Sequence, residues 1–346
     1  MQAVRWTLAQ VTSPHVTNPV VVIAAKDIPY VTNGNRFQTL SIYLPKTPET
    51  SRLIGTPATS LPTSTSPGSS LPRHHVHIHG GAWRDLFLTS ASIEPTVVCA
   101  FAASHSSAGT IDAIVSLNYT LSPFPTHPTA PYDPGKGDHG QPEREATHPA
   151  HVRDVLTAFS FLTKYGLKSG GYILTGHSAG ACLAFQATLQ QPQHWGLTEL
   201  PAPPQPAAIL GFNGLYDLPA LVHGLGPSHE GLRNVYEMLQ SIAFGGDQNT
   251  WGIASPAYFD PEEIEKRIQD GYIPQLVLLD QSAEDQLVPM NQLERLEASL
   301  KRVNGLQVVR GKRCTGRHAA PWEQGNVIWE SVEDVLSLLK GGPDMS

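Results

Sequence analysis

The Gly-His-Ser-Ala-Gly segment at residues 176–180 constrains the fold of this chain most, because of the residues that flank it. It directly follows an apolar run at 171–175 that is typical of a strand, and it leads into an apolar, helix-like stretch at 178–190. Glycines on both sides of a serine permit a sharp strand-to-helix turn that exposes the serine at its tip. A helix that begins there also aims unpaired backbone N–H groups at developing negative charge. The segment therefore predicts that Ser178 is a nucleophile, and the alternative is an inert tight turn.

A second glycine motif, His-Gly-Gly-Ala-Trp at residues 79–83, follows another apolar run. Two adjacent glycines let the backbone turn and approach a reacting carbonyl group closely. The backbone N–H groups of Gly81 and Ala82, together with that of Ala179, would then form an oxyanion hole. Alone, the motif would indicate a simple turn after a strand. Its combination with the segment at 176–180 favours the oxyanion hole.

The histidines that lead into this motif have two interpretations. His75, His77 and His79 lie on one face of the expected strand, and alternating histidines can bind zinc. No carboxylate cluster accompanies them, so we favour a support role in which His79 hydrogen-bonds the loop and Gly80 permits its turn. Trp83 is equally compatible with a core anchor and with an apolar wall of the pocket. We therefore predict no metal site and no organic cofactor.

A serine nucleophile needs a base, and the base needs a carboxylate that orients it. The chain order serine, acid, histidine is typical of a nucleophile on this kind of turn. Three acidic residues follow the apolar run at 276–279, downstream of Ser178. They are Asp280, Glu284 and Asp285. We favour Asp285, because the short loop before it can return its side chain toward the serine. His318 is the only histidine after this loop and is therefore the predicted base.

The remaining pattern predicts an α/β fold. Short apolar, β-branched runs predict strands at residues 20–23, 39–43, 75–79, 113–118, 172–175, 208–210, 276–279 and 307–309. Helical patterns lie at residues 150–165, 178–190, 292–303 and 326–339. Strands that alternate with helices indicate a mostly parallel central sheet of about eight strands with helices on both faces. No helix separates the two opening strands, so we expect an antiparallel start.

We expect a single domain over residues 1–346, since this length allows one large α/β domain with insertions. A Ser/Thr/Pro-rich stretch at 46–72 is expected to be a mobile surface insertion, because it offers little to bury. A proline-rich stretch at 123–149 is expected to be an irregular loop that borders a site. The stretch at 217–270 is a candidate cap over the edge of the sheet.

Charge and hydropathy exclude several classes of protein. The formal charge of −7 disfavours a nucleic-acid binder, which needs a basic face. No run approaches the about 20 apolar residues of a membrane helix, and no secretory signal is visible at the start. The three cysteines, Cys99, Cys182 and Cys314, are sparse and fit a reducing compartment. We expect a cytoplasmic protein with a small-molecule substrate, and a homodimer is compatible with the sequence.

Taken in order, these motifs resemble the α/β-hydrolase superfamily and, more narrowly, the fungal kynurenine formamidases (arylformamidases), whose HGGxW loop matches residues 79–83. The resemblance extends to His318 and so spans about 240 residues. It implies an α/β-hydrolase fold and a serine hydrolase that cleaves the formamide of N-formyl-L-kynurenine to L-kynurenine and formate. The implied triad is Ser178, Asp285 and His318. The alternative is a carboxylesterase that acts on short-chain acyl esters. The stretch Tyr-Thr-Leu-Ser-Pro at 119–123 departs from the pattern of related lipases and weakens that reading.

Overall fold

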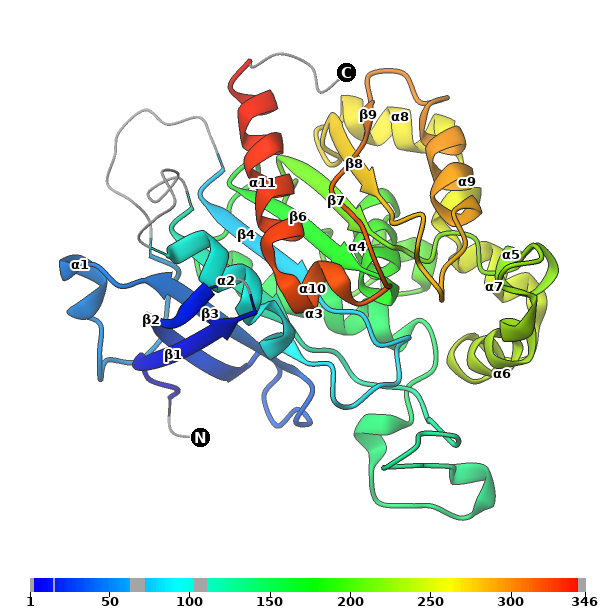
Figure 1. The fold of residues 1–346 in the computed structure, drawn as a ribbon, viewed down its shortest axis with the longest axis horizontal. Helices are drawn as coiled ribbons and strands as arrows, with labels where there is room; N and C mark the ends of the chain where they lie inside the picture. The colour runs from blue at the N-terminus through cyan, green and yellow to red at the C-terminus, as the bar shows by residue number, and fades with distance from the viewer. Residues whose placement is uncertain (1–2, 15, 63–71, 103–110, 342–346) are drawn as a thin grey trace.

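A sheet of nine strands forms the centre of the computed structural model, which describes residues 3–14, 16–62, 72–102 and 111–341 (Figure 1). Its strand order is β1-β2-β3-β5-β4-β6-β7-β8-β9. The strands are β1 (Thr7–Ser13), β2 (Val16–Pro29), β3 (Thr39–Pro45), β4 (His74–Ile78), β5 (Ala113–Leu117), β6 (Tyr172–His177), β7 (Ala208–Phe212), β8 (Leu276–Asp280) and β9 (Gln307–Arg310). The pairs β1–β2, β2–β3 and β3–β5 are antiparallel. The remaining neighbours, from β5 through β4, β6, β7 and β8 to β9, are parallel. The mostly parallel sheet and its antiparallel start are confirmed.

The additional strand is β1, which the sequence pattern did not predict. It lies at the edge of the sheet, pairs only with β2, and leaves Leu8 more than half exposed. Val11 and Ser13 are its buried residues. An edge strand with so little buried surface has no clear alternation of apolar and polar residues, so its sequence resembles a loop.

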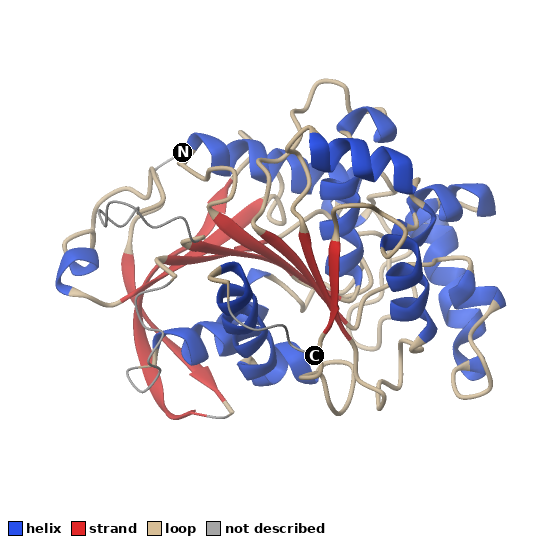
Figure 2. Ribbon diagram, turned by 90° about the horizontal axis from the view of Figure 1, so that it is seen from above, coloured by secondary structure: helices blue, strands red, loops and turns tan. Residues whose placement is uncertain are grey.

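Helices cover both faces of the sheet (Figure 2). The helices are α1 (Pro48–Ser51), α2 (Glu94–Phe101), α3 (Ala150–Lys164), α4 (Ala179–Leu189), α5 (Ala220–His223), α6 (Arg233–Phe244), α7 (Gln248–Ala254), α8 (Pro261–Gln269), α9 (Asn291–Leu300), α10 (Ala320–Gln324) and α11 (Asn326–Leu339). Short 3-10 turns lie at η1 (Ser90–Ile93), η2 (Pro134–Lys136), η3 (Pro142–Arg144), η4 (Pro192–Trp195), η5 (Glu230–Leu232) and η6 (Pro256–Tyr258). None of the helices in the described ranges is both long enough and apolar enough to span a bilayer.

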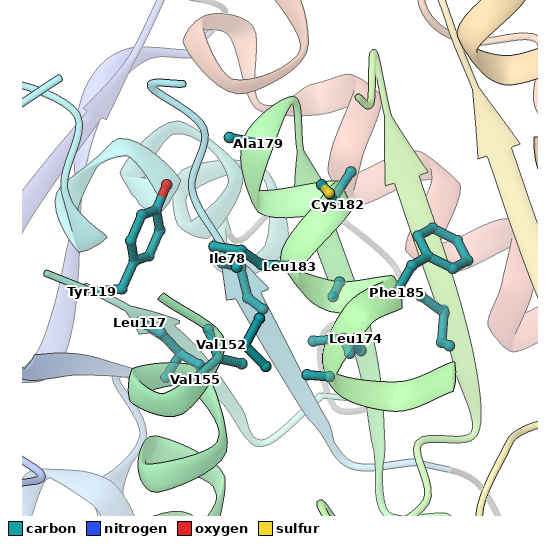
Figure 3. Packing of buried hydrophobic residues seen from close by; sticks show 14 of the residues in the cluster. Ile78, Leu117, Tyr119, Val152, Val155, Leu174, Ala179, Cys182, Leu183 and Phe185 are labelled. Atoms are coloured by element: carbon teal, nitrogen blue, oxygen red, sulfur yellow. The ribbon is translucent and has the colours of Figure 1, made fainter. Parts of the chain in front are cut away.

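Two apolar cores lie on opposite faces of the sheet. Successive strand residues alternate between them, so Ile173 packs with α2 and α11 while Leu174 packs with α3 and α4. Every residue of α4 is buried. Cys182, Leu183 and Phe185 of this helix lie in the core that contains Leu174 and residues of α3 (Figure 3). A helix that is apolar on all sides is held by its surroundings on all sides, and α4 therefore fixes the turn from which it starts.

The insertion at 46–72 is only partly described, since residues 63–71 lie outside the described residues. Its described part differs from the expected surface loop, because Ala58 and Leu61 are buried in the core. The backbone N–H of Leu61 donates to the carbonyl oxygen of Tyr165 at 2.7 Å, and the Tyr165 hydroxyl donates to Ala58 at 2.8 Å. These bonds dock the segment on the end of α3. The composition of the stretch did not indicate this contact.

The other two insertions lie entirely within the described residues. The stretch at 123–149 is irregular, contains only the two short turns η2 and η3, and extends away from the sheet (Figure 1). The stretch at 217–270 contains four helices, α5 to α8. Helix α6 has the most consequence for function, because its residues line the cavity described below.

A buried pair of histidines occupies the face of β4 that packs toward α2 and α11. His75 Nε2 lies 2.6 Å from the hydroxyl oxygen of Thr175 on β6, and His77 Nδ1 lies 2.8 Å from the same oxygen. The second ring nitrogen of each histidine has no partner among the described residues. Burial lowers the pKa of His75 to about 3, and the pKa of His77 is also far below its ordinary value. Both rings are therefore neutral in the folded protein at neutral pH.

Replacing His75 with glutamine should make the protein less sensitive to acid. Unfolding restores the ordinary pKa of the ring, so the unfolded state binds a proton below about pH 6.5 while the folded state does not. As the pH falls from about 6.5 to about 3, His75 therefore lowers the free energy of unfolding by about 1.4 kcal/mol for each pH unit.

Urea unfolding at about pH 7 and pH 5 measures this slope. His75→Gln should reduce it by about that amount. The matched control Thr175→Val removes the shared hydroxyl but no titratable group, so it should lower stability at both pH values and keep the wild-type slope. Equal slopes in His75→Gln and the wild type would contradict the neutral buried ring.

Candidate active site

Ser178 lies at the junction of β6 and α4 with φ 55° and ψ −121°. A residue other than glycine rarely adopts a positive φ, and such strain persists only where neighbouring structure enforces it. Here the Ser178 amide donates to the carbonyl oxygen of Phe212 on β7 at 2.9 Å. The Ser178 carbonyl accepts from the Ala181 amide at 3.0 Å. The serine is thus held in a strained backbone conformation at the strand-to-helix turn, where it is buried but lines a cavity.

The two glycines of the motif are required by close packing. A Cβ atom on Gly176 would lie 2.4 Å from the carbonyl oxygen of Gly180. A Cβ atom on Gly180 would lie 2.1 Å from the carbonyl oxygen of Ile78, at the end of β4. Both distances are far below contact distance, so no other residue fits without movement of the backbone. The start of α4 therefore packs directly on the strand that leads into the 79–83 loop.

The 79–83 loop is strained over three successive residues. Gly81, Ala82 and Trp83 have φ values of 95°, 50° and 57°, although only the first is a glycine. The amides of Arg84 and Asp85 both donate to the Gly81 carbonyl oxygen at 2.9 Å and close the turn. Strain at Ala82 and Trp83 persists only where the surrounding structure enforces it, and such strain is common at functional sites.

Side chains below the loop support it from the core. The Tyr119 hydroxyl lies 3.1 Å from the carbonyl oxygen of His79 and 2.9 Å from that of Gly80. The His79 ring stacks on the Tyr119 ring with a centroid distance of 4.6 Å. Trp83 is fully buried and packs edge-on against Phe244 at 4.9 Å, so it is a core anchor and not a wall of the cavity.

His318 and Asp285 form a close pair. Nδ1 of His318 lies 2.7 Å from Oδ2 of Asp285, whose side chain is fully buried. The other carboxylate oxygen accepts from the amides of Leu287 at 2.8 Å and Val288 at 2.9 Å. These bonds fix the carboxylate and place the Nδ1 proton between the pair, which leaves Nε2 of His318 free to act as a base.

The other two candidate acids are used elsewhere. Asp280 Oδ2 accepts from the amides of Arg313 at 2.9 Å and Cys314 at 3.2 Å, and burial raises the pKa of this carboxyl group. Glu284 is exposed and accepts from the Gly316 amide at 2.7 Å. Asp280 and Glu284 therefore bind backbone amides of the segment that precedes His318, whereas Asp285 contacts the His318 ring.

Two residues that hold His318 in place were not assigned a role from the sequence. The carbonyl oxygen of His318 accepts from Nε2 of His177 at 2.8 Å and from the side-chain amide of Asn213 at 3.0 Å. Asn213 also accepts from the Ser282 amide at 3.0 Å. Burial keeps the pKa of His177 low, so its ring is a neutral donor. Asn213 directly follows β7, whose last residue pairs with His177 at the end of β6. A polar residue at the end of this strand was the sequence feature that could have indicated its role.

A cavity of about 500 Å³ contains both Ser178 and His318 at its surface, within the range of small-molecule sites. Gly81 and Ala82 also line it, whereas Ala179 lies directly behind Ser178 and is buried. Apolar residues from several elements form most of the remaining wall: Leu88, Phe124, Leu215, Leu232, Val235, Leu239, Leu287, Val288 and Trp322. The cavity therefore offers an apolar site beside the serine and the histidine.

The zinc alternative finds no structural support. His75 and His77 both contact Thr175, as described above. Over the described ranges, no three or more His, Cys, Asp or Glu side chains converge as a metal site would need. Asp217, which follows β7 in the chain, accepts from the Ala220 amide at 2.9 Å and pairs with Arg295 at 3.0 Å, so its contacts are structural.

Solved structures with a similar fold include esterases that are distant in sequence. A truncated carbohydrate esterase from gut microbiota has a TM-score of 0.55 and 15% identity, over 92% of this chain and 95% of the other. Esterase B from Lactobacillus rhamnosis has a TM-score of 0.56 and 16% identity, over 96% and 86%. Together with the sheet order, this likeness shows that the chain has the α/β-hydrolase fold.

Curated relatives are closer in sequence. The kynurenine formamidase-like hydrolase fscH of Fusarium equiseti is 30% identical over 319 residues, which cover 90% of this chain and 94% of the relative. Kynurenine formamidase avaC of Aspergillus versicolor is 32% identical, over 68% of this chain and 80% of the relative. No family model matches the chain. The chain belongs to the kynurenine formamidase-like hydrolases of the α/β-hydrolase fold.

Proposed function

We propose that this hydrolase cleaves the formamide of N-formyl-L-kynurenine, with Ser178 as nucleophile, His318 as base and Asp285 as the orienting acid. The observation that carries the proposal is the 2.7 Å contact between Asp285 and His318, beside the cavity that Ser178 lines. A base held in one tautomer beside a cavity that a strained serine lines is the arrangement that acyl transfer needs. The kynurenine formamidase names of the relatives support the substrate.

The first half of the proposed reaction transfers the formyl group to the enzyme. Ser178 Oγ attacks the formyl carbon while Nε2 of His318 takes the hydroxyl proton. The amides of Gly81, Ala82 and Ala179 stabilise the resulting oxyanion, and each such donor contributes a rate factor of about 10²–10³. His318 then gives its proton to the arylamine nitrogen, and the C–N bond breaks. L-kynurenine leaves, and the formyl group remains on Ser178 as an ester.

The second half returns the serine. His318 takes a proton from a water molecule, which attacks the formyl carbon and forms a second oxyanion in the same site. The bond to Ser178 Oγ then breaks, the serine recovers its proton from His318, and formate leaves. The sequence of steps needs no metal ion and no organic cofactor. Asp285 stabilises the imidazolium form of His318.

The apolar cavity supports an aryl substrate. Phe124, Leu239 and Trp322 are among the side chains that line it, and their surfaces suit an aromatic ring. Helix α6 supplies Val235, Tyr236 and Leu239, so the 217–270 stretch acts as a cap in this proposal. A small acyl ester would leave most of this apolar surface uncovered.

Ser178→Ala should lower kcat on N-formyl-L-kynurenine by about 10⁴-fold or more, because the variant lacks the nucleophile. The release of kynurenine, followed by absorbance, measures the rate. The wild type should also show a higher kcat/KM for N-formyl-L-kynurenine than for p-nitrophenyl acetate. A large preference for the ester would favour the carboxylesterase alternative, and full activity of Ser178→Ala would contradict the mechanism.

Asp285→Asn should lower kcat by about 10⁴-fold, because an amide favours the wrong tautomer of His318. The matched control is Asp280→Asn, which changes a buried carboxylate that binds two backbone amides but does not contact the base. It should lower the melting temperature and keep kcat within about tenfold of the wild type. Equal losses of kcat in the two variants would contradict the assignment of Asp285.

A further inference from the structure

Arg84 is a buried cation on the wall of the cavity that contains Ser178. Its side chain is only 5% exposed, and Nε and Nη1 have no hydrogen-bond partner among the described residues. Its guanidinium carbon lies 3.9 Å from the centre of the Phe124 ring, which also lines the cavity. The proposed reaction makes no use of this residue.

The buried guanidinium group of Arg84 is attracted to the Asp85 carboxylate, but its Nε and Nη1 atoms make no hydrogen bond to any described residue. Burial lowers the pKa of Arg84 to about 10, so the group still carries its charge at neutral pH. A buried charge that lacks a partner destabilises a protein, whereas a planar guanidinium with two free donors pairs strongly with a carboxylate. The stacked Phe124 ring holds the guanidinium plane but satisfies none of its N–H groups. The arrangement therefore suits an anionic ligand that enters the cavity.

Arg84 is also rigidly linked to the proposed oxyanion hole. The turn in which Arg84 and Asp85 donate to the Gly81 carbonyl joins the guanidinium to the amides of Gly81 and Ala82. Asp85 lines the same cavity, and its Oδ1 atom accepts from the Phe87 amide at 2.9 Å. One short turn thus carries the oxyanion donors, a cation and an anion.

We infer that Arg84 binds the α-carboxylate of an amino-acid substrate, with Asp85 beside the neighbouring α-ammonium group. This inference rests on the proposed function, because the substrate it describes is the one that Ser178 would cleave. The opposite charges at the end of the apolar wall match a zwitterion attached to an aryl ring. The residue pair makes the site selective for a formamide that carries an amino-acid end over a simple aryl formamide.

The test compares two substrates that differ only in the carboxylate: N-formyl-L-kynurenine and its decarboxylated analogue, N-formylkynuramine. Arg84→Met keeps the apolar stem and removes the charge. It should lower the ratio of kcat/KM for the first substrate to kcat/KM for the second by about 10- to 100-fold, mostly through KM. Asp85→Asn should lower kcat/KM for both substrates, since both retain the ammonium group.

Controls separate this inference from the proposed function. Arg153→Met, at an exposed arginine on α3, should leave the ratio at its wild-type value. A wild-type enzyme that cleaves neither formamide would contradict the proposed function itself. A wild type that cleaves both, with equal losses for both in Arg84→Met, would leave that function intact and overturn the carboxylate site.

A binding measurement provides a readout that does not depend on turnover. Calorimetry of Ser178→Ala with L-kynurenine measures affinity for the amino-acid end. Adding Arg84→Met to that variant should weaken binding by about 10- to 100-fold. Equal affinity in the single and double variants, with both folded by circular dichroism, would contradict a role for Arg84 in carboxylate binding.

Discussion

The contact between Gly180 and the end of β4 is the constraint on which the rest of the site depends. With no side chain on Gly180, the first turn of α4 lies directly on the carbonyl oxygens of Ile78 and His79. Ser178 precedes that turn, and the 79–83 loop follows those carbonyls. The serine and the candidate oxyanion donors are therefore positioned by one packing contact, and the buried helix α4 holds it in place.

The candidate base, His318, and the candidate acid, Asp285, reach the same edge of the sheet by a second set of contacts. Asn213 binds both the loop that carries Asp285, through Ser282, and the carbonyl group of His318. His177, next to Ser178 in the chain, binds the same carbonyl group. The loops after β7, β8 and β9 are thereby tied to the serine turn by buried hydrogen bonds. Such positioning of side chains from several strands is what a parallel sheet offers at the carboxyl ends of its strands.

The sequence predicted those parts that depend on local pattern. Glycines around Ser178, strand–helix alternation and the order of Asp285 and His318 indicated the fold class and the residues that meet. The edge strand β1 was missed, because few of its residues are buried. The burial of Leu61 and the roles of Asn213, His177 and Arg84 depend on contacts between segments far apart in the chain. Neither the spacing of motifs nor the composition of the chain predicts such contacts.

The most direct test of the account is to trap the covalent intermediate. The enzyme is mixed with N-formyl-L-kynurenine, quenched with acid within one turnover, digested and examined by mass spectrometry. We predict one formyl group on the peptide that contains Ser178, on that residue, with kynurenine released in an initial burst. Release of kynurenine at the wild-type rate without any formylated Ser178 would contradict the account.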